Sequence, residues 1–213
     1  MSRSIPVSSP DLASQDILTD YKLSHLKIRK AVPGDVEGII KVAASVGKST
    51  KDPEIGFLVS DYSSNKLVHT FKLKRQFNNV DYFYVAETLG EIVGFLQAYS
   101  KQKWLEENPF WLSEVYWKPG YAHIKNSDFA VIEKTAVIAP LTGYGIGSRL
   151  YEVLFQALRK DGLSGVIAET VVSPLPNLAS LRFRVKQRYE LVGIRYERVR
   201  DEMLTDLVYY KKV

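Results

Sequence analysis

The sequence contains no cysteine and few histidines. None of its 213 residues is a cysteine, which excludes disulfide bonds, thiolate metal sites and cysteine nucleophiles. The three histidines, His25, His69 and His123, are not spaced as a pair of metal ligands. We therefore expect no metal site, and the composition is compatible with a reducing intracellular compartment.

Long apolar runs and blocks of like charge are also missing. No segment approaches the roughly 20 apolar residues of a membrane span, and the first residues lack the basic-then-apolar order of a signal peptide. We therefore expect a cytoplasmic protein that does not bind a membrane. The net charge is +5, but Lys and Arg are interspersed with Asp and Glu, so a nucleic acid is not an expected partner.

The composition does support a folded domain, because 46% of the residues are hydrophobic. Residues 1–22 are rich in Ser, Asp and Pro without a sustained period, and we expect them to form an N-terminal arm or extension. No repeat or linker divides residues 23–213, so these are expected to form one α/β domain.

Hydrophobic periodicity predicts strands that alternate with helices. Strands are expected at residues 25–31, 80–87, 91–99, 129–138, 165–172, 189–196 and 206–212. Helices are expected to begin at Pro33, to cover 65–77 and 177–187, and to run from Ile146 to the stop signal Asp161-Gly162. Residues 101–127 are rich in aromatic side chains and have no clean period, which predicts an irregular insertion that either borders a binding site or covers the sheet.

Residues 137–148, VIAPLTGYGIGS, are the most informative segment. A β-branched run is followed by Gly143, Gly145 and Gly147 and then by an amphipathic helix. Without Cβ atoms, successive backbone N–H groups can turn toward one point, and the helix adds its unpaired N-terminal donors and partial positive charge. Such a turn suits a phosphate or pyrophosphate. The alternative is that the glycines form only a tight connection from strand to helix.

Other phosphate-binding motifs fit this sequence less well. Glycines at every second position do not match the dinucleotide fingerprint, and Ser148-Arg149 stands where a Walker loop requires Lys and then Ser or Thr. Residues 47–50, GKST, resemble the end of a Walker motif, but a helix precedes them where that motif requires a strand. We therefore expect Gly47 to end a helix and do not expect nucleotide hydrolysis.

The order of elements and residues 136–150 resemble the GNAT superfamily of acyl-CoA N-acyltransferases, over residues 23–213. The cofactor motif of that family is Arg or Gln, two residues, Gly, one residue, and Gly or Ala. Gly145 and Gly147 match it, and Gly143 is an additional common glycine. Thr142 replaces the usual Arg or Gln, but the main-chain donors that hold the pyrophosphate do not depend on that side chain.

A second, looser resemblance follows. Asn177 and Phe183 resemble the later asparagine-and-helix motif of the family. Many members carry a tyrosine in this helix as a general acid, and the matching position here is Arg184. The usual Gly-Phe after the helix has become Arg188-Tyr189, so the acid of the family cannot simply be carried over.

The resemblance implies an α/β fold with a mixed, splayed central β-sheet flanked by helices. Acetyl-CoA, the implied cosubstrate, would lie between the strand ending near Ile138 and the strand through Glu169, with its pantetheine arm paired to the backbone of residues 137–139. The implied cofactor-binding residues are Val137, Ile138, Ala139, Thr142, Gly143, Tyr144, Gly145, Ile146, Gly147, Ser148 and Asn177.

The implied activity is transfer of an acetyl group to a primary amine of a small molecule or protein, by direct attack of the amine on the thioester. This reaction needs a base for the amine and a proton donor for the leaving thiolate. Glu133 and Glu169 are the candidate bases, and Tyr144 and Tyr189 are candidate donors. The alternative is a noncatalytic acyl-CoA-binding regulatory module on the same fold, and both a monomer and a homodimer are compatible with the sequence.

Overall fold

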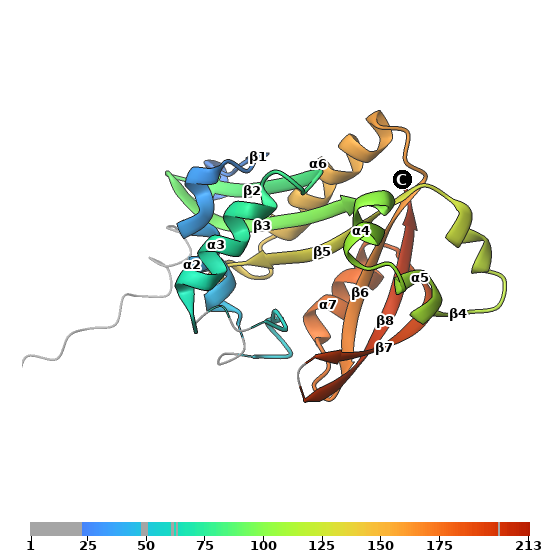
Figure 1. The fold of residues 1–213 in the computed structure, drawn as a ribbon. Helices are drawn as coiled ribbons and strands as arrows, with labels where there is room; N and C mark the ends of the chain where they lie inside the picture. Colours follow the sequence, from blue (N-terminus) through green and yellow to red (C-terminus); the bar gives the residue numbers. More distant parts are fainter. Residues whose placement is uncertain (1–22, 48–50, 61, 63, 200) are drawn as a thin grey trace, which may run out of the picture.

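The computed structural model describes residues 23–47, 51–60, 62, 64–199 and 201–213. The predicted N-terminal arm, residues 1–22, lies outside this part, as do Lys48, Ser49 and Thr50 of the Walker-like segment. The described residues form an eight-stranded mixed sheet with helices on both faces (Figure 1). The expected α/β class and mixed sheet are thus confirmed.

The strands lie in the order β1-β2-β3-β5-β6-β8-β7-β4. Their bounds are β1 Lys27–Lys30, β2 Tyr82–Thr88, β3 Glu91–Ser100, β4 Tyr116–Trp117, β5 Phe129–Val137, β6 Gly165–Ser173, β7 Glu190–Val199 and β8 Glu202–Lys212. β5 and β6 pair in parallel, and the other described neighbours pair in antiparallel fashion. The strands expected at 80–87 and 91–99 form a hairpin, and β5, α6 Ile146–Lys160 and β6 form a β-α-β unit.

The described helices are α2 Val36–Ser45, α3 Lys66–Gln76, α4 Lys101–Glu107, α5 Trp111–Glu114, α6 Ile146–Lys160 and α7 Leu178–Lys186, with 3-10 turns η1 Pro33–Asp35, η3 Ala122–Asn126 and η4 Ala139–Leu141. Four of them, α2, α3, α6 and α7, fall close to the predicted ranges, whereas α4 and α5 lie where no helix was predicted. Gly47 follows the last turn of α2, and its amide donates to the Ala44 carbonyl oxygen at 3.3 Å. Gly47 therefore does end a helix, as predicted. No helix in the described part of the chain has the length and apolar character that a membrane crossing requires.

Helices cover the two faces of the sheet in three groups (Figure 1). On one face, α6 buries Ile146, Leu150, Leu154 and Leu158, one residue per turn, against β2, β3, β5 and β6. On the other face, α2 and α3 cover the half formed by β2 and β3. The aromatic side chains of the segment that follows β3 cover the remaining half, over β5, β6, β7 and β8.

The prediction of an irregular insertion at residues 101–127 was wrong. This segment contains α4, α5, β4 and η3. Trp111 is 1% exposed, and its indole ring lies edge-on to Trp104 and Trp117, with ring centroids 6.3 Å apart in each pair. The helices have seven and four residues, which is too short for a hydrophobic period to appear in the sequence. The segment thus meets both expectations, because its buried aromatic residues cover the sheet and Trp104 also lines the cavity described below.

Candidate active site

The central feature of the site is the separation of β5 from β6. The two strands pair in parallel only over Phe129–Ile132 and Gly165–Ala168. Beyond these residues β5 continues beside β3 alone, and β6 continues beside β8 alone. A cavity of about 570 Å³ lies at this opening and is lined by both strands. The sheet is therefore splayed, as the resemblance implied.

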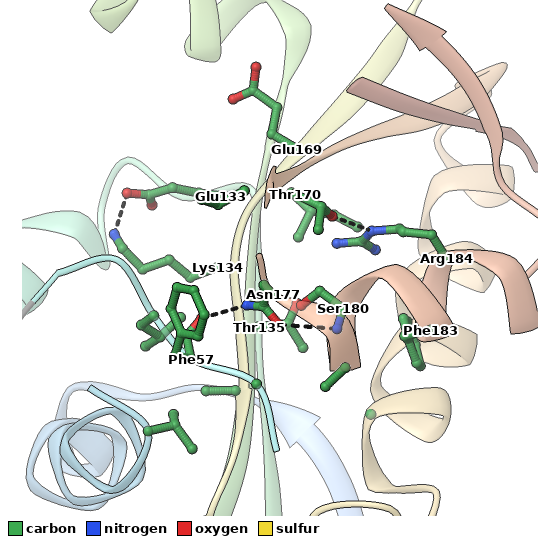
Figure 2. A pocket seen from close by; sticks show the side chains of 18 of the residues that line it. Phe57, Glu133, Lys134, Thr135, Glu169, Thr170, Asn177, Ser180, Phe183 and Arg184 are labelled. Atoms are coloured by element: carbon green, nitrogen blue, oxygen red, sulfur yellow. Dashed lines mark hydrogen bonds and ion pairs between the residues drawn. The ribbon is translucent and has the colours of Figure 1, made fainter. Parts of the chain in front are cut away.

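A β-bulge marks the point on β5 where the opening begins. Gln97 of β3 faces Lys134 and Ala98 faces Ile132, so Glu133 is an extra residue on β5. A bulge interrupts the alternation of side chains along a strand. Glu133 and Lys134 consequently project to the same side of the opening, opposite the side from which Arg184 enters (Figure 2).

Glu133 and Lys134 form an ion pair at the wall of the cavity. The Lys134 ammonium donates to Glu133 Oε1, whereas Glu133 Oε2 is buried and has no hydrogen-bond partner among the described residues. Burial lowers the pKa of Lys134, but the carboxylate of Glu133 and the hydroxyl of Tyr62 together raise it, so that the pKa lies above its ordinary value. Lys134 is therefore a cation that orients the carboxylate and leaves one oxygen free.

Glu169 lies on β6, across the opening from Glu133 (Figure 2). Its Oε1 accepts a hydrogen bond from the Trp111 indole N–H at 3.0 Å, and its Oε2 lies 3.3 Å from Arg195 Nη1. Burial raises the pKa of the Glu169 carboxyl to about 7, although Arg195 acts in the opposite direction. Glu169 therefore titrates in the range that suits a general base, but both of its oxygens are already hydrogen-bonded.

The glycine turn also lines the cavity. Gly143 and Gly145 have φ angles of 93° and 84°, and Gly145 is the N-cap of α6. The first backbone bond into the helix joins Arg149 N–H to the Gly145 carbonyl oxygen at 3.1 Å. The amides ahead of Arg149 in the first turn thus have no acceptor within the helix, and no side chain caps them. Free amides at a helix N-terminus are suited to binding an anion, and the predicted turn lies on the cavity wall.

A sequence profile of the acetyltransferase (GNAT) family matches residues 56–186 of this chain, which include the bulge, the glycine turn, α6 and α7. The chain belongs to the GNAT family. It is a GNAT N-acetyltransferase, and members of this family use acetyl-CoA to acetylate amines. No curated protein sequence matches the chain.

Solved structures of GNAT proteins share the fold at low sequence identity. The polyamine N-acetyltransferase of Drosophila melanogaster is 15% identical, with a TM-score of 0.59 over 88% of this chain and 100% of that chain. An N-acetyltransferase of Staphylococcus aureus is 17% identical, with a TM-score of 0.57 over 88% and 98% of the two chains. The PaiA N-acetyltransferase of Thermoplasma acidophilum, solved in complex with coenzyme A, is 18% identical, with a TM-score of 0.55 over 88% and 99%.

Most of the cofactor-binding residues predicted for this GNAT domain line the cavity. They are Val137, Thr142, Gly143, Gly145, Ile146, Gly147, Ser148 and Asn177. Ile138, Ala139 and Tyr144 do not line it. The Ile138 amide donates to the Val93 carbonyl oxygen at 2.8 Å and the Ala139 amide to Ser45 Oγ at 3.2 Å, so these two amides are already occupied.

Asn177 has a positioning role in this GNAT domain. Its Oδ1 accepts a hydrogen bond from the Ser180 amide at 3.1 Å and so caps α7, while its Nδ2 donates to the Phe57 carbonyl oxygen at 2.9 Å (Figure 2). The Ala179 amide also donates to the Pro53 carbonyl oxygen, at 2.9 Å. Asn177 therefore fixes the segment around Phe57, which lines the cavity, against the start of α7.

Arg184, which the family resemblance matched to a tyrosine, is a buried cation at the cavity wall. Its side chain comes from α7, and the residue is 6% exposed. Nη1 donates to the Tyr151 hydroxyl at 2.8 Å, and Nε donates to Thr170 Oγ1 at 3.3 Å. No carboxylate of the described residues lies within ion-pair distance of Arg184. The site thus holds a positive charge whose hydrogen-bond partners, Tyr151 and Thr170, are neutral.

Among the residues of this GNAT cavity that were not predicted from the sequence are Tyr151 and Asp206. The Tyr151 hydroxyl reaches the cavity next to Arg184, whereas the candidate donors Tyr144 and Tyr189 do not line it. Tyr151 was not predicted because it lies among the buried apolar residues of α6, where a tyrosine usually only packs. Asp206 could have been found, because it lies between Leu204 and Val208 in the alternation of β8, at a position that must face inward.

The raised pKa of Glu169 predicts how stability depends on pH. The unfolded chain releases this proton near 4.5 and the folded chain near 7, so ionisation weakens the folded state as pH rises through that window. Relative to Glu169→Gln, the natural protein should lose up to about 3 kcal/mol of unfolding free energy between pH 4.5 and 7. Urea denaturation at a series of pH values measures this difference. If the difference in unfolding free energy between the two proteins does not change with pH, the raised pKa of Glu169 is refuted.

Proposed function

We propose that this protein transfers the acetyl group of acetyl-CoA to a primary amine of a small molecule or protein, by direct attack of the amine on the thioester. The observation that carries the proposal is one cavity that joins an anion-binding helix N-terminus to a buried carboxylate with a free oxygen. The first feature suits the cofactor phosphates, and the second suits an amine that must lose a proton.

The proposed path of the cofactor follows the opening of the sheet. The free amides at the start of α6 would hold the pyrophosphate, and Gly147, whose nearest neighbour for an added Cβ is Phe183 Cε2 at 3.7 Å, leaves room for it. The pantetheine arm would lie between the separated parts of β5 and β6, where each strand has an edge without a strand partner. The thioester would then reach the region between Glu133 and Arg184.

Two carboxylates are candidates for the base, and different observations favour each. Glu133 has a buried oxygen without a partner, which is free to accept the proton of an amine. Glu169 has a pKa of about 7, because it is buried, and therefore gains and loses a proton near neutral pH. Both carboxylates line the cavity, so mutagenesis must decide between them.

Arg184 and Tyr151 would serve the leaving group. When the C–S bond breaks, negative charge develops on sulfur, and a fixed cation in a site shielded from water stabilises that charge. Arg184 is such a cation, and the Tyr151 hydroxyl beside it can donate its proton to the sulfur. The guanidinium would stabilise the phenolate until solvent returns the proton.

The glycine turn is tested by Gly147→Val. This glycine lies in the first turn of α6 at an ordinary φ, and an added Cβ meets only Phe183 at an ordinary contact distance, so the variant should fold. We expect CoA binding to weaken by at least about 1.4 kcal/mol, which is tenfold, because the branched side chain enters the phosphate path. Calorimetry and the rise in Tm with CoA measure binding.

Matched controls separate lost binding from lost stability. Thr142→Ala should bind CoA nearly as the natural protein does, because the main-chain donors remain. Gly145→Val and Gly162→Val replace glycines with φ of 84° and 76°, each with open space around the added Cβ, but only Gly145 lines the cavity. Both should lose similar stability, and only Gly145→Val should lose affinity. Normal affinity in folded Gly147→Val and Gly145→Val would mean that the turn is only a structural connection.

The base is tested by Glu133→Gln and Glu169→Gln. The variant that lacks the base should lose turnover by roughly 10²-fold or more while it still binds CoA, because Gln keeps the shape of the side chain but cannot accept the proton. Release of free CoA with a panel of primary amines measures turnover. Binding of acetyl-CoA without thiol release by the natural protein would instead support a noncatalytic module.

The leaving-group role is tested by Arg184→Met and Arg184→Lys. Met fills similar space without charge, so it should bind CoA and fold, since replacing a buried charge by a packed apolar side chain is often tolerated. We expect kcat to fall roughly 10²-fold in Arg184→Met and less in Arg184→Lys, which keeps the charge. Equal kcat in the natural protein and a folded Arg184→Met would exclude Arg184 from this step.

A further inference from the structure

A buried carboxylate without a partner lies at the acceptor side of the cavity. Asp206 of β8 is 4% exposed and lines the cavity, yet its Oδ2 has no hydrogen-bond partner among the described residues. Burying a carboxylate without a donor or a counter-ion costs several kcal/mol in general. A side chain of this kind indicates that something outside the described chain supplies the missing donor.

The neighbouring cation, Arg195, already forms ion pairs with other carboxylates. Arg195 faces Asp206 across the β7–β8 pair, but its guanidinium lies 2.9 Å from Glu114 Oε2 and 3.3 Å from both Glu169 Oε2 and Glu197 Oε2. Four carboxylates therefore surround one guanidinium. The cluster has an excess of negative charge, and burial together with the charge of Glu197 raises the pKa of Asp206 to about 6.

The cluster lies on the same side of the sheet as Glu133. Directly opposed residues of paired strands share a face, and Asp206 is opposed to Val171, two residues beyond Glu169. Glu133 continues the alternation of Val131, which packs with Ile167 in the aromatic-covered half of the sheet. The anion-binding turn and Arg184 belong to the opposite face, with α6 and α7. The carboxylates thus lie on the face away from the proposed cofactor phosphates.

We infer that Asp206 and Glu197 form a second cation subsite, so that the acceptor is a diamine or polyamine with one amine at the thioester and another ammonium held by these carboxylates. The inference rests on the proposed function and specifies its substrate class. Tyr99 and Trp104 line the same cavity and offer an apolar wall for the methylene spacer between the two nitrogens. An ammonium has the hydrogen-bond donors and the charge that the Asp206 carboxylate lacks.

The test compares acceptors that differ only in their second charge. Release of CoA from acetyl-CoA is measured with diamines of three to six methylene groups, with butylamine and with 4-aminobutanoate. We expect the best diamine to exceed butylamine in kcat/KM by at least tenfold, mainly through a lower KM, and 4-aminobutanoate to be the poorest acceptor. Equal kcat/KM for diamines and butylamine would overturn the subsite while the proposed function stands.

Variants locate the subsite. Asp206→Asn keeps the volume of the side chain and should reduce the ratio of diamine to butylamine kcat/KM at least tenfold. Glu197→Gln, whose side chain is 40% exposed and whose replacement does not disturb the core, should reduce the same ratio. Glu202→Gln, at an exposed position of the same strand as Asp206, is the matched control and should leave the ratio unchanged. A ratio unchanged in both folded variants would overturn the inference.

A binding measurement separates the two proposals. Calorimetry with the best diamine and the CoA-bound protein should show binding that weakens at least tenfold in Asp206→Asn. Diamine binding of this kind without thiol release would support the subsite and refute the transferase activity. Release of CoA from acetyl-CoA with butylamine as the acceptor, together with no preferential binding of the diamine, would refute the subsite alone.

Discussion

The separation of β5 from β6 is the constraint on which the site depends. Four residue pairs hold the strands together, and beyond Ile132 and Ala168 each strand keeps only its outer neighbour. The bulge at Glu133 lies where the separation begins, and it turns two consecutive charged side chains to one side. A continuous parallel ladder would fill this space with backbone hydrogen bonds and leave neither a cavity nor inward-facing strand edges.

The opening also divides charge between the two faces of the sheet. Positive potential gathers on the face of α6 and α7, from the free amides of the helix N-terminus and from Arg184. Carboxylates gather on the other face, where Glu133, Glu169 and Asp206 line the cavity and outnumber the cations Lys134 and Arg195. A polyanionic cofactor and a cationic amine would each be attracted to its own face, so the proposed reaction partners would meet at the opening.

The walls of the cavity are held in place by residues that also stabilise the fold. Asn177 caps α7 and binds the Phe57 carbonyl oxygen, so one side chain orders two segments of the wall. Trp111 packs among aromatic rings and at the same time donates to Glu169. Buried networks of this kind keep a site in one arrangement only if their polar groups are satisfied. Five buried side-chain atoms of the described residues lack a hydrogen-bond partner, and two of them, Glu133 Oε2 and Asp206 Oδ2, are carboxylate oxygens of residues that line the cavity.

The sequence by itself determined the elements whose signals are local. The glycine turn, the apolar stripe of α6, the β2–β3 hairpin and the Asn177 cap could be predicted because periodicity, turn chemistry and capping depend on residues a few positions apart. Only the tertiary structure decided where β5 leaves β6, that the aromatic segment forms α4, α5 and β4, and that Arg184 meets Tyr151. These features depend on contacts between residues far apart in the chain, such as the 33 positions between Tyr151 and Arg184, and no local pattern encodes such contacts.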